Sequence, residues 1–369
     1  MRIGVPRETK DQENRIGIVP DGARTLCGRG HEVLIERGAG LGSGFPDAAF
    51  EKVGARIVDT EEAWSAPDLI MKVKEPSARE VAFLRAGQIL YTYLHLAAAR
   101  ELTDALLAAD VIGVAYETIQ NPDGSFPVLA PMSEVAGRLA VQIGVTLLQR
   151  DRGGKGLLVG GVPGVPRGRV TVIGAGTVGI NAVRVAHALG AEVDVLDVDL
   201  KRLAYLYDIF GGELNTLYSN RGNIERSVAG TDLLIGAVYV YGRRAPRLVT
   251  REMVAGMEDG SVIVDVAVDQ GGCVETIRVT SHSDPTYRVD GVIHYGVPNI
   301  PGAVPRTSTF ALTNATLPYA EQIADLGIEE ALRASPELAL GVNLWRGHVV
   351  CEGVAESLGL PQRALAELL

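Results

Sequence analysis

Four polar residues in this chain have types that together could bind a small charged substrate and move protons on it. They are Arg15 in "ENRIGIVP", Lys74 in "KVKEP", His95 in "YTYLHLAAAR" and Asp269 in "VDQGG". Arginine offers a planar, permanently charged fork for a carboxylate, and a histidine with an ordinary pKa of about 6.5 exchanges protons near neutral pH. Lysine stabilises negative charge on a carbonyl oxygen, and a carboxylate accepts a proton. Taken singly, each residue is more often a solvated or structural group than a catalytic one.

The elements predicted around these residues place them at one kind of position. Short apolar runs predict strands over residues 2–6, 32–36, 68–74, 88–94, 111–117 and 261–269. Lys74 and Asp269 are the last residues of their runs. His95 directly follows its run, and Arg15 lies in the loop after the first. Because ligands of doubly wound sheets bind outside the carboxyl ends of the strands, we expect these side chains to share one crevice.

Strand-like and helix-like segments alternate along most of the 369 residues. One β-α-β series fills residues 1 to about 125, and a second runs from about 169 to 300. Helical patterns over 309–327 and 335–344 follow. Such alternation is typical of parallel sheets covered by helices. We therefore predict an α/β fold of two doubly wound, Rossmann-like domains with mostly parallel sheets, separated by a cleft.

The stretch between the two series predicts the domain boundary. Residues 120–131 are rich in turn-forming residues, and a long helix is predicted over 132–149 with Ser133 as its N-cap. The glycine-rich residues 153–168 lack the pattern of a phosphate-binding P-loop, since glycine rather than serine or threonine follows Lys155. We predict a hairpin or a covering loop there.

The strongest local motif is "VIGAGTVG", in which Gly174, Gly176 and Gly179 follow an apolar strand and open an amphipathic helix. In this motif the first glycine permits a tight turn, the second admits a pyrophosphate and the third lets helix and strand pack closely. Asp197 ends the next strand, where a carboxylate accepts hydrogen bonds from an adenosine ribose. The motif predicts NAD binding, although the cations at 201–202 leave NADP open. A Rossmann-like domain that binds another nucleotide, or none, is the alternative.

Composition excludes several classes of function. The chain carries 35 basic and 45 acidic residues, a net charge of −10, which argues against nucleic acid or an anionic membrane as partner. No apolar run nears the roughly 20 residues needed to cross a bilayer, and no cluster has metal-ligand spacing. The three cysteines are far apart and favour a reducing compartment. We expect a cytoplasmic protein without a bound metal.

Eight segments together resemble the NAD-dependent L-alanine dehydrogenases, of the alanine dehydrogenase/pyridine nucleotide transhydrogenase family. In order they are "RETKDQENRIGIVP", "KVKEP", "YLHLAA", "APMSEVAGRLA", "GGVPGV", "VIGAGTVG", "DQGG" and "VPRTSTFALTNAT", which span essentially the whole chain. The resemblance implies reversible NAD-dependent oxidative deamination of L-alanine to pyruvate and ammonia. It also implies a homo-oligomer, commonly a homohexamer. The expected domains are a discontinuous substrate/catalytic domain, 1–128 plus 303–369, and an NAD-binding Rossmann domain, 129–302.

Matched motifs carry the family's site residues onto this chain. Arg15 would bind the substrate carboxylate, and Lys74 would polarise its keto or imino group. His95 would be the acid/base, and Asp269 the catalytic carboxylate. The implied cofactor-contacting residues are Ser133, Gly174, Gly176, Val178, Gly179, Asp197, Arg202, Ser219, Val238, Tyr239, Val266, Asp269, Val297, Asn299 and Ile300.

Two departures and three alternatives accompany this interpretation. Tyr241 stands where the family pattern has proline, and Arg243–Arg244 follow in the same loop, which puts its shape and the cofactor affinity in doubt. The alternative functions are a transhydrogenase-like hydride-transfer subunit, a dehydrogenase for a larger amino acid and a catalytically silent NAD-binding protein. Substrate breadth beyond alanine and the direction of the reaction stay open.

Overall fold

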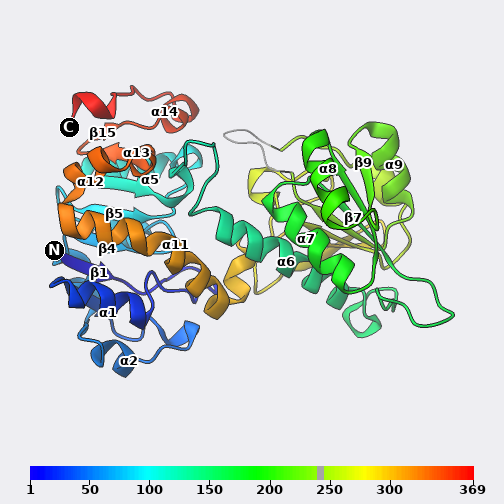
Figure 1. Ribbon diagram of the computed structural model, residues 1–369, viewed down its shortest axis with the longest axis horizontal. Coiled ribbons are helices and arrows are strands. Elements are labelled where there is room, and N and C mark those ends of the chain that lie inside the picture. The colour runs from blue at the N-terminus through cyan, green and yellow to red at the C-terminus, as the bar shows by residue number, and fades with distance from the viewer. Residues whose placement is uncertain (239–244) are drawn as a thin grey trace. The chain divides into compact units, whose positions relative to one another are not determined.

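The structure, a computed structural model, describes residues 1–238 and 245–369. It divides into two compact units (Figure 1): a first unit of Met1–Met132 with Val304–Leu369, and a second of Ser133–Ala303. The predicted boundaries, after residues 128 and 302, lie close to these divisions. Tyr239 and the departures at Tyr241 and Arg243–Arg244 lie outside the described residues.

The first unit is built on an eight-stranded sheet with the order β15-β14-β6-β5-β4-β1-β2-β3. The strands are β1 (Arg2–Val5), β2 (Glu32–Glu36), β3 (Arg56–Val58), β4 (Leu69–Met71), β5 (Ile89–Thr92), β6 (Ile112–Ala115), β14 (Val342–Trp345) and β15 (His348–Val349). The first six pair in parallel in the order 6-5-4-1-2-3, the arrangement of a doubly wound fold. Their burial is nearly complete, as parallel strands covered on both faces require.

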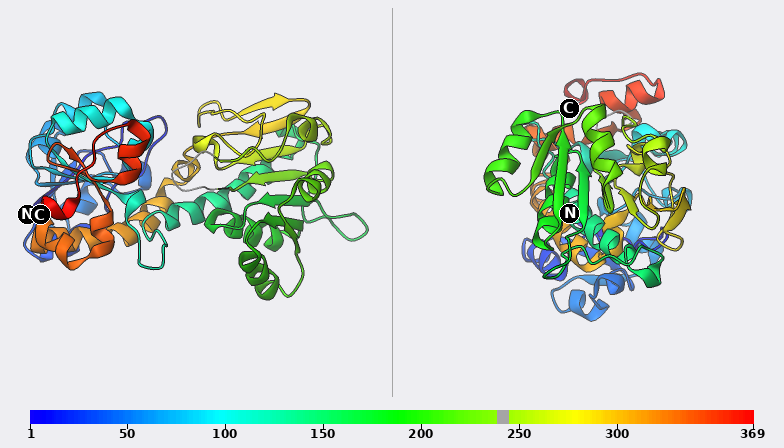
Figure 2. Two further views of the ribbon diagram at one scale, coloured as in Figure 1. Left: turned by 90° about the horizontal axis from the view of Figure 1, so that it is seen from above. Right: turned by 90° about the vertical axis from the view of Figure 1, so that its right-hand side faces the viewer.

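Helices cover both faces of this sheet. The α-helices are α1 (Pro20–Gly28), α2 (Asp47–Glu51), α3 (Thr60–Ser65), α4 (Ala78–Val81), α5 (Arg100–Ala108), α11 (Pro305–Leu326), α12 (Ile328–Ala334), α13 (Pro336–Leu340) and α14 (Glu352–Leu358). Figure 2 shows cyan helices on one face and the orange α11 on the other. Leu106 of α5 and Val354 of α14 pack in one apolar cluster with Ile70 and Leu90 of the sheet.

The C-terminal segment corrects one prediction. The helix predicted across 335–344 ends at Leu340, and Val342–Trp345 forms β14, antiparallel to β6. Gly341 closes the helix and its carbonyl accepts a hydrogen bond from the amide of Ala115 at 2.7 Å. Helical periodicity in this short apolar run was therefore overridden by pairing with a strand more than 200 residues earlier, which local pattern does not reveal.

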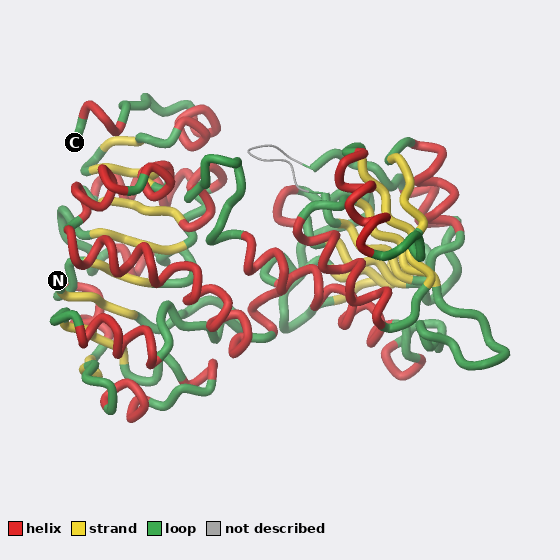
Figure 3. Tube along the Cα trace, in the orientation of Figure 1, coloured by secondary structure: helices red, strands yellow, loops and turns green. Residues whose placement is uncertain are grey.

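The second unit contains a seven-stranded sheet with the order β12-β13-β11-β10-β7-β8-β9. Its strands are β7 (Arg169–Ile173), β8 (Glu192–Asp197), β9 (Asn215–Tyr218), β10 (Leu233–Gly236), β11 (Val262–Asp265), β12 (Thr286–Val289) and β13 (Val292–Tyr295). Its α-helices, besides most of α6 (Ala130–Leu147), are α7 (Thr177–Ala188), α8 (Leu200–Ile209), α9 (Arg221–Ala229) and α10 (Arg251–Ala255). In this sheet only β12 runs antiparallel to its neighbour. The other strands are parallel in the order β13-β11-β10-β7-β8-β9, which repeats the 6-5-4-1-2-3 arrangement of the first unit. Figure 3 shows the strands of each unit as yellow segments that lie side by side. Two doubly wound, mostly parallel sheets were predicted, and this fold class is confirmed.

Two further predictions concern the segments around α6. Ser133 was predicted as its N-cap, which is wrong: the helix begins at Ala130, and Ser133 lies in its first turn. Pro131 explains the earlier start, because the fixed φ of proline suits the first helical positions. The glycine-rich residues 153–168 were predicted as a hairpin or a covering loop. They form a loop without a strand, in which Val162 and Val165 make one isolated antiparallel bridge across a turn.

Candidate active site

The candidate residues of the first unit lie in loops just beyond neighbouring strands. β1, β4, β5 and β6 are adjacent in the sheet. Lys74 follows the end of β4 by three residues, and His95 follows the end of β5 by three. They were predicted at the ends of longer strands, and the observed strands stop at Met71 and Thr92. The positions at the carboxyl edge of the sheet, where doubly wound folds bind ligands, are unchanged by this correction.

Arg15 is a buried cation held by a carboxylate on its own loop. Its Nε donates to Oε1 of Glu13 at 2.7 Å and its Nη2 to Oε2 at 2.5 Å, while Nη1 lies 3.2 Å from the sulfur of Met132. The guanidinium is only 2% exposed. Burial lowers the pKa of such a group, but Glu13 more than offsets this and the pKa of Arg15 is raised. Arg15 is therefore permanently charged and fixed in orientation by a two-bond pair.

The segment "KVKEP" is fixed by a second buried ion pair. Lys72 is fully buried, and its Nζ lies 2.6 Å from Oε2 of Glu8. The other oxygen of Glu8 accepts hydrogen bonds from the amides of Val73 at 2.7 Å and Lys74 at 3.3 Å. One carboxylate in the loop after β1 thus determines the backbone path of the lysine candidate beyond β4.

Lys74 differs from Lys72 in its electrostatic surroundings. Burial lowers the pKa of Lys74, and the charges of Arg15 and Lys10 act in the same direction against the opposing charge of Glu75. Glu75 itself forms an ion pair with Lys10. Lys74 therefore releases its proton more readily than an ordinary lysine does, a property that is common among lysines of functional sites.

His95 has an unusual backbone and a defined ring orientation. Its φ is +50°, in the left-handed region that non-glycine residues rarely adopt. The imidazole stacks on Tyr93, with ring centres 5.7 Å apart and planes within 5°. The hydroxyl of Tyr93 donates to the carbonyl of Val128 at 3.0 Å, which fixes the stacking surface. The side chain is 45% exposed, so solutes can reach the ring.

Glu117, just beyond β6, explains how the strained turn at His95 is held. Its carboxylate accepts hydrogen bonds from the amides of Leu94 at 3.2 Å and His95 at 2.6 Å. The same Oε1 lies 3.8 Å from Nδ1 of His95. Glu117 therefore holds the backbone of this turn and lies beside the ring of His95.

In the second unit, the glycine turn between β7 and α7 has the geometry expected of its sequence. Gly174 has a φ of +101°, and a Cβ there would lie 2.5 Å from the carbonyl oxygen of Ala237. A Cβ at Gly179 would lie 1.8 Å from the carbonyl oxygen of Gly174. At Gly176, the N-cap of α7, the nearest atom is Nη1 of Arg202 at 3.9 Å. Two glycines therefore permit tight packing, and the third leaves open space at the positive end of a helix of 12 residues.

Asp197 joins the glycine turn to the end of β8. Its Oδ2 accepts a hydrogen bond from the amide of Ala175 at 2.5 Å, and its Oδ1 accepts one from the amide of Asp199 at 2.8 Å. Arg202 lies 3.8 Å from Asp197 and 3.6 Å from Asp199. A carboxylate at this place accepts hydrogen bonds from a ribose, and its charge disfavours a 2′-phosphate.

The remaining cofactor candidates of the second unit surround the same edge of the sheet. Asp269 lies in a single 3₁₀ turn, Val268–Gln270, and its Oδ1 accepts a hydrogen bond from the amide of Gln270 at 3.0 Å. Val178 is in the first turn of α7, and Ser133 is in the first turn of α6. The others follow the ends of β9, β10, β11 and β13: Ser219, Val238, Val266, Val297, Asn299 and Ile300.

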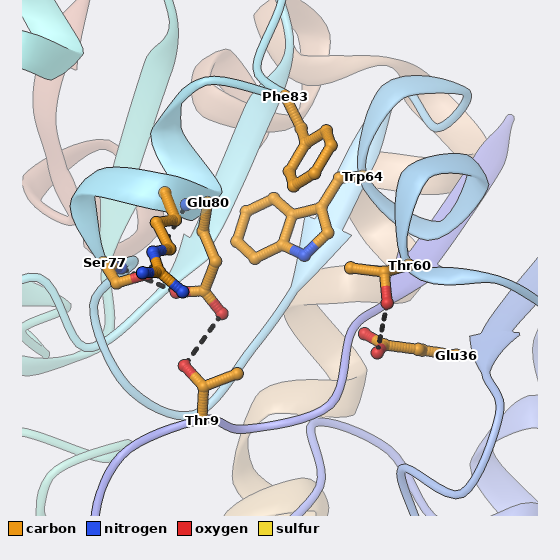
Figure 4. A pocket seen from close by; sticks show the side chains of 8 residues that line it. Thr9, Glu36, Thr60, Trp64, Ser77, Glu80 and Phe83 are labelled. Carbon is orange, nitrogen blue, oxygen red and sulfur yellow. Dashed lines mark hydrogen bonds between the residues drawn. The ribbon is translucent and has the colours of Figure 1, made fainter.

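A separate pocket of about 470 Å³ lies in the first unit (Figure 4). Its lining is Thr9, Glu36, Thr60, Trp64, Ser77, Arg79, Glu80 and Phe83. The hydroxyl of Thr9 donates to Glu80 at 3.2 Å, and that of Thr60 donates to Glu36 at 2.8 Å. These carboxylates hold neighbouring loops and helices by hydrogen bonds. The pocket includes none of the described candidate residues.

Comparison with known proteins identifies the family. The family model "Alanine dehydrogenase/PNT, N-terminal domain" matches residues 4–136, and "Alanine dehydrogenase/PNT, C-terminal domain" matches residues 140–352. An alanine dehydrogenase of Staphylococcus haemolyticus is 52% identical over 370 residues, which cover 100% of this chain and 99% of that protein. This chain belongs to the alanine dehydrogenase/PNT family. The predicted family is therefore confirmed.

Solved structures of the alanine dehydrogenase/PNT family agree with the fold. An L-alanine dehydrogenase matches with a TM-score of 0.94 and 51% identity, covering 97% of this chain and 99% of that one. A transhydrogenase from Sinorhizobium meliloti matches with a TM-score of 0.81 and 26% identity, covering 95% and 99%.

Three carboxylates near the candidate residues were not predicted: Glu8, Glu13 and Glu117. Each contacts a candidate residue of this family member directly, by a hydrogen bond or an ion pair. Glu117 carried a usable signal, because it ends the apolar run after the one that precedes His95. Glu8 and Glu13 are in the first loop among other charged residues, and local sequence does not distinguish them from solvated surface charges.

Proposed function

We propose that this chain is an NAD-dependent L-alanine dehydrogenase, which converts L-alanine reversibly to pyruvate and ammonia. The observation that carries the proposal is the identity of about half of all residues, over the full length, with proteins named alanine dehydrogenase. The arrangement of ionisable groups beyond β1, β4 and β5 supports it, because the reaction needs a carboxylate clamp, a polarising cation and a proton carrier.

The first unit provides groups for the substrate. Arg15 binds the carboxylate of alanine or pyruvate, because Glu13 keeps its guanidinium charged and oriented. Lys74 donates a hydrogen bond to the keto or imino group and stabilises negative charge on oxygen. Its lowered pKa brings proton release closer to the working pH than in an ordinary lysine. We propose the first unit as the substrate/catalytic domain.

Proton transfer is assigned to His95 and Asp269. His95 accepts and returns the proton as water adds to the imino intermediate and ammonia leaves. Tyr93 sets the plane of the imidazole, and the carboxylate of Glu117 lies 3.8 Å from its Nδ1. Asp269 handles a proton of the amine or of the incoming water.

The second unit has residues that fit NAD. The open position at Gly176 and the N-terminus of α7 accept the pyrophosphate, and Asp197 accepts the hydroxyls of the adenosine ribose. The candidates beyond β10, β11 and β13 would line the nicotinamide half. Bound NAD supplies the ring that takes the hydride from Cα of alanine. We propose the second unit as the NAD-binding domain.

The test is NADH formation from L-alanine and NAD⁺ at alkaline pH, followed by absorbance. Rapid turnover with alanine and little with serine, glycine or a second nicotinamide nucleotide would support the proposal. NAD binding in a thermal-shift assay without turnover of any amino acid would favour the silent binder. Hydride transfer between nucleotides without alanine turnover would favour the transhydrogenase-like alternative.

We further propose a cytoplasmic homo-oligomer without a bound metal. In residues 1–238 and 245–369 no helix is long and apolar enough to cross a membrane. Within the same residues no three His, Cys, Asp or Glu side chains are grouped to hold a metal ion. A homohexamer is proposed from the family resemblance.

A further inference from the structure

Asp265 is a fully buried carboxylate that joins the two ends of one loop. It is the last residue of β11 and has no exposed surface. Its Oδ1 accepts a hydrogen bond from the amide of Ala267 at 3.0 Å. Its Oδ2 accepts hydrogen bonds from the amides of Cys273 at 2.8 Å and Val274 at 3.1 Å. Three backbone donors from the start and the end of the loop thus meet on one side chain.

Two glycines from different elements make room for this carboxylate. A Cβ at Gly236, at the end of β10, would lie 2.8 Å from Oδ1 of Asp265 and 2.7 Å from the sulfur of Cys273. A Cβ at Gly272 would lie 2.8 Å from Oδ2, and Gly272 has a φ of +74°. The site is therefore shaped around the carboxylate by close backbone approach, which only glycine permits.

The loop that Asp265 closes carries Asp269. Between the bonded amides of Ala267 and Cys273 lie residues 268–272, and within them Gln270 and Gly272 donate to the carbonyl of Ala267. On the return side, the carbonyl of Cys273 accepts hydrogen bonds from the amides at 248 and 249. The path of the 3₁₀ turn that presents Asp269 therefore depends on where these two anchors are held.

We infer that Asp265 is a positioning residue: its carboxylate clamps both ends of the loop 266–274 and so fixes the catalytic carboxylate Asp269. In this role Asp265 contacts the backbone amides of the loop and does not itself bind substrate or cofactor. The catalytic role of Asp269 in this inference rests on the proposed function. The clamp itself rests on the hydrogen bonds of Asp265 alone.

The electrostatics of Asp265 agree with a role other than stability. Burial raises its pKa to about 6, although the three amides oppose this. The facing titratable groups are the thiol of Cys273, whose pKa burial and then Asp265 raise, and the phenol of Tyr287 on β12. The charged form of Asp265 therefore costs free energy in the folded protein. In return, its hydrogen bonds hold the loop 266–274 in one conformation.

The clamp is tested by hydrogen exchange of the full chain without substrate or cofactor. Asp265→Asn replaces one acceptor oxygen by a donor that faces backbone amides, and Gly236→Ala places a methyl against the same carboxylate. Both should speed exchange in the peptide 266–274 by about tenfold or more, with the rest of the sheet unchanged. The control is Asp194→Asn, which alters another buried aspartate, on β8, bonded to Asn215 at 2.8 Å. Unchanged loop exchange in whichever of the two variants folds would overturn the inference.

The positioning role is tested by a double-mutant cycle in kcat for L-alanine. Asp265→Asn should lower kcat by about tenfold or more in the wild-type background and by less than about threefold in an Asp269→Asn background. Equal losses in both backgrounds would mean that Asp265 acts by a route other than Asp269, and would overturn the positioning role. If Asp269→Asn keeps full activity while the loop exchange changes as expected, the assignment of Asp269 fails and the clamp stands.

Discussion

At the scale of the residue, His95 combines strain, stacking and a neighbouring carboxylate. The backbone conformation of His95, with φ +50°, costs free energy. The hydrogen bonds that the amides of Leu94 and His95 donate to Glu117 offset this cost. The result is an imidazole whose plane and position are set before a substrate arrives. Pre-set geometry of this kind is what proton transfer requires.

His95→Ala should lower kcat by about 10²- to 10⁴-fold, the usual contribution of a general acid/base. NAD binding should be unchanged, because the proposed cofactor residues are in the second unit. Steady-state kinetics and NAD titration check the two expectations. A variant that keeps more than about a third of wild-type turnover would remove His95 from the mechanism.

The two lysines of "KVKEP" should respond oppositely to replacement by methionine. Lys72→Met leaves the carboxylate of Glu8 buried without its partner and should destabilise the protein by about 3 kcal/mol. Lys74→Met removes a cation whose pKa is lowered by burial, so the charged form is disfavoured by the fold. Lys74→Met should therefore abolish activity without lowering the thermal unfolding temperature.

Thermal unfolding near neutral pH, with kinetics on the same samples, measures both lysine variants. The sign for Lys74 is fixed by its lowered pKa: its charge is a cost to stability that disappears as pH rises through the folded-state pKa. A marked fall in the unfolding temperature of Lys74→Met would contradict this account.

At the scale of the element, different glycines of the turn between β7 and α7 serve packing and NAD binding. Gly179→Ala places a Cβ 1.8 Å from a carbonyl oxygen and should prevent the turn from forming. Gly176→Ala meets only a flexible arginine at 3.9 Å, so stability should be kept while NAD affinity falls by about tenfold or more. Urea denaturation and NAD titration distinguish the two. Equal stability of the two variants would contradict the packing role of Gly179.

The pH dependence of stability at the end of β11 has a definite sign. The pKa of Asp265 is about 6 in the fold against 3.8 for an unperturbed aspartate, so the folded chain binds this proton more tightly between those values. Relative to Asp265→Asn, the wild-type free energy of unfolding should rise by up to about 3 kcal/mol as pH falls from 7 to 4. Denaturation of both proteins across this range measures the difference. A difference that is constant with pH would mean that burial does not raise this pKa.

Much of this architecture was predictable from local pattern, and the failures have different causes. Gly174 and Gly179 were predictable because a tight turn and a close contact each demand glycine. β14 was not, because it depends on pairing with β6. The start of α6 was misplaced because Pro131, two residues before the expected cap, lies inside the first turn of the helix. Glu8 and Glu117 were missed because their importance arises only when separate loops meet. Glu13 was missed because nothing in the local sequence marks it as buried beside Arg15.

At the scale of the whole molecule, the two units share one sheet topology and differ in the loops that follow the strands. Both arrange six parallel strands in the order 6-5-4-1-2-3. The loops beyond the strands of the first carry the buried cations, and those of the second carry the glycine turn. The proposed division of roles between substrate and cofactor therefore depends on the loops, while the sheets provide the same support.

The proposed homohexamer predicts a mass of about 235 kDa in solution, six times 39.1 kDa. Light scattering on the purified full chain at physiological ionic strength measures it. A monodisperse species at one or two chain masses across the micromolar range would contradict the hexamer, and would leave the catalytic assignments untouched.

The position of β14 constrains how the protein is made. The edge of the sheet at β6 is covered only after Val342–Trp345 has been synthesised. All of Ser133–Ala303 leaves the ribosome after β6 and before β14. The second unit is contiguous and can fold during synthesis, whereas the first 132 residues remain with an open strand edge and without α11. A chain that stops before residue 342 would display that edge, so loss of the last strand should lead to aggregation more than to loss of NAD binding.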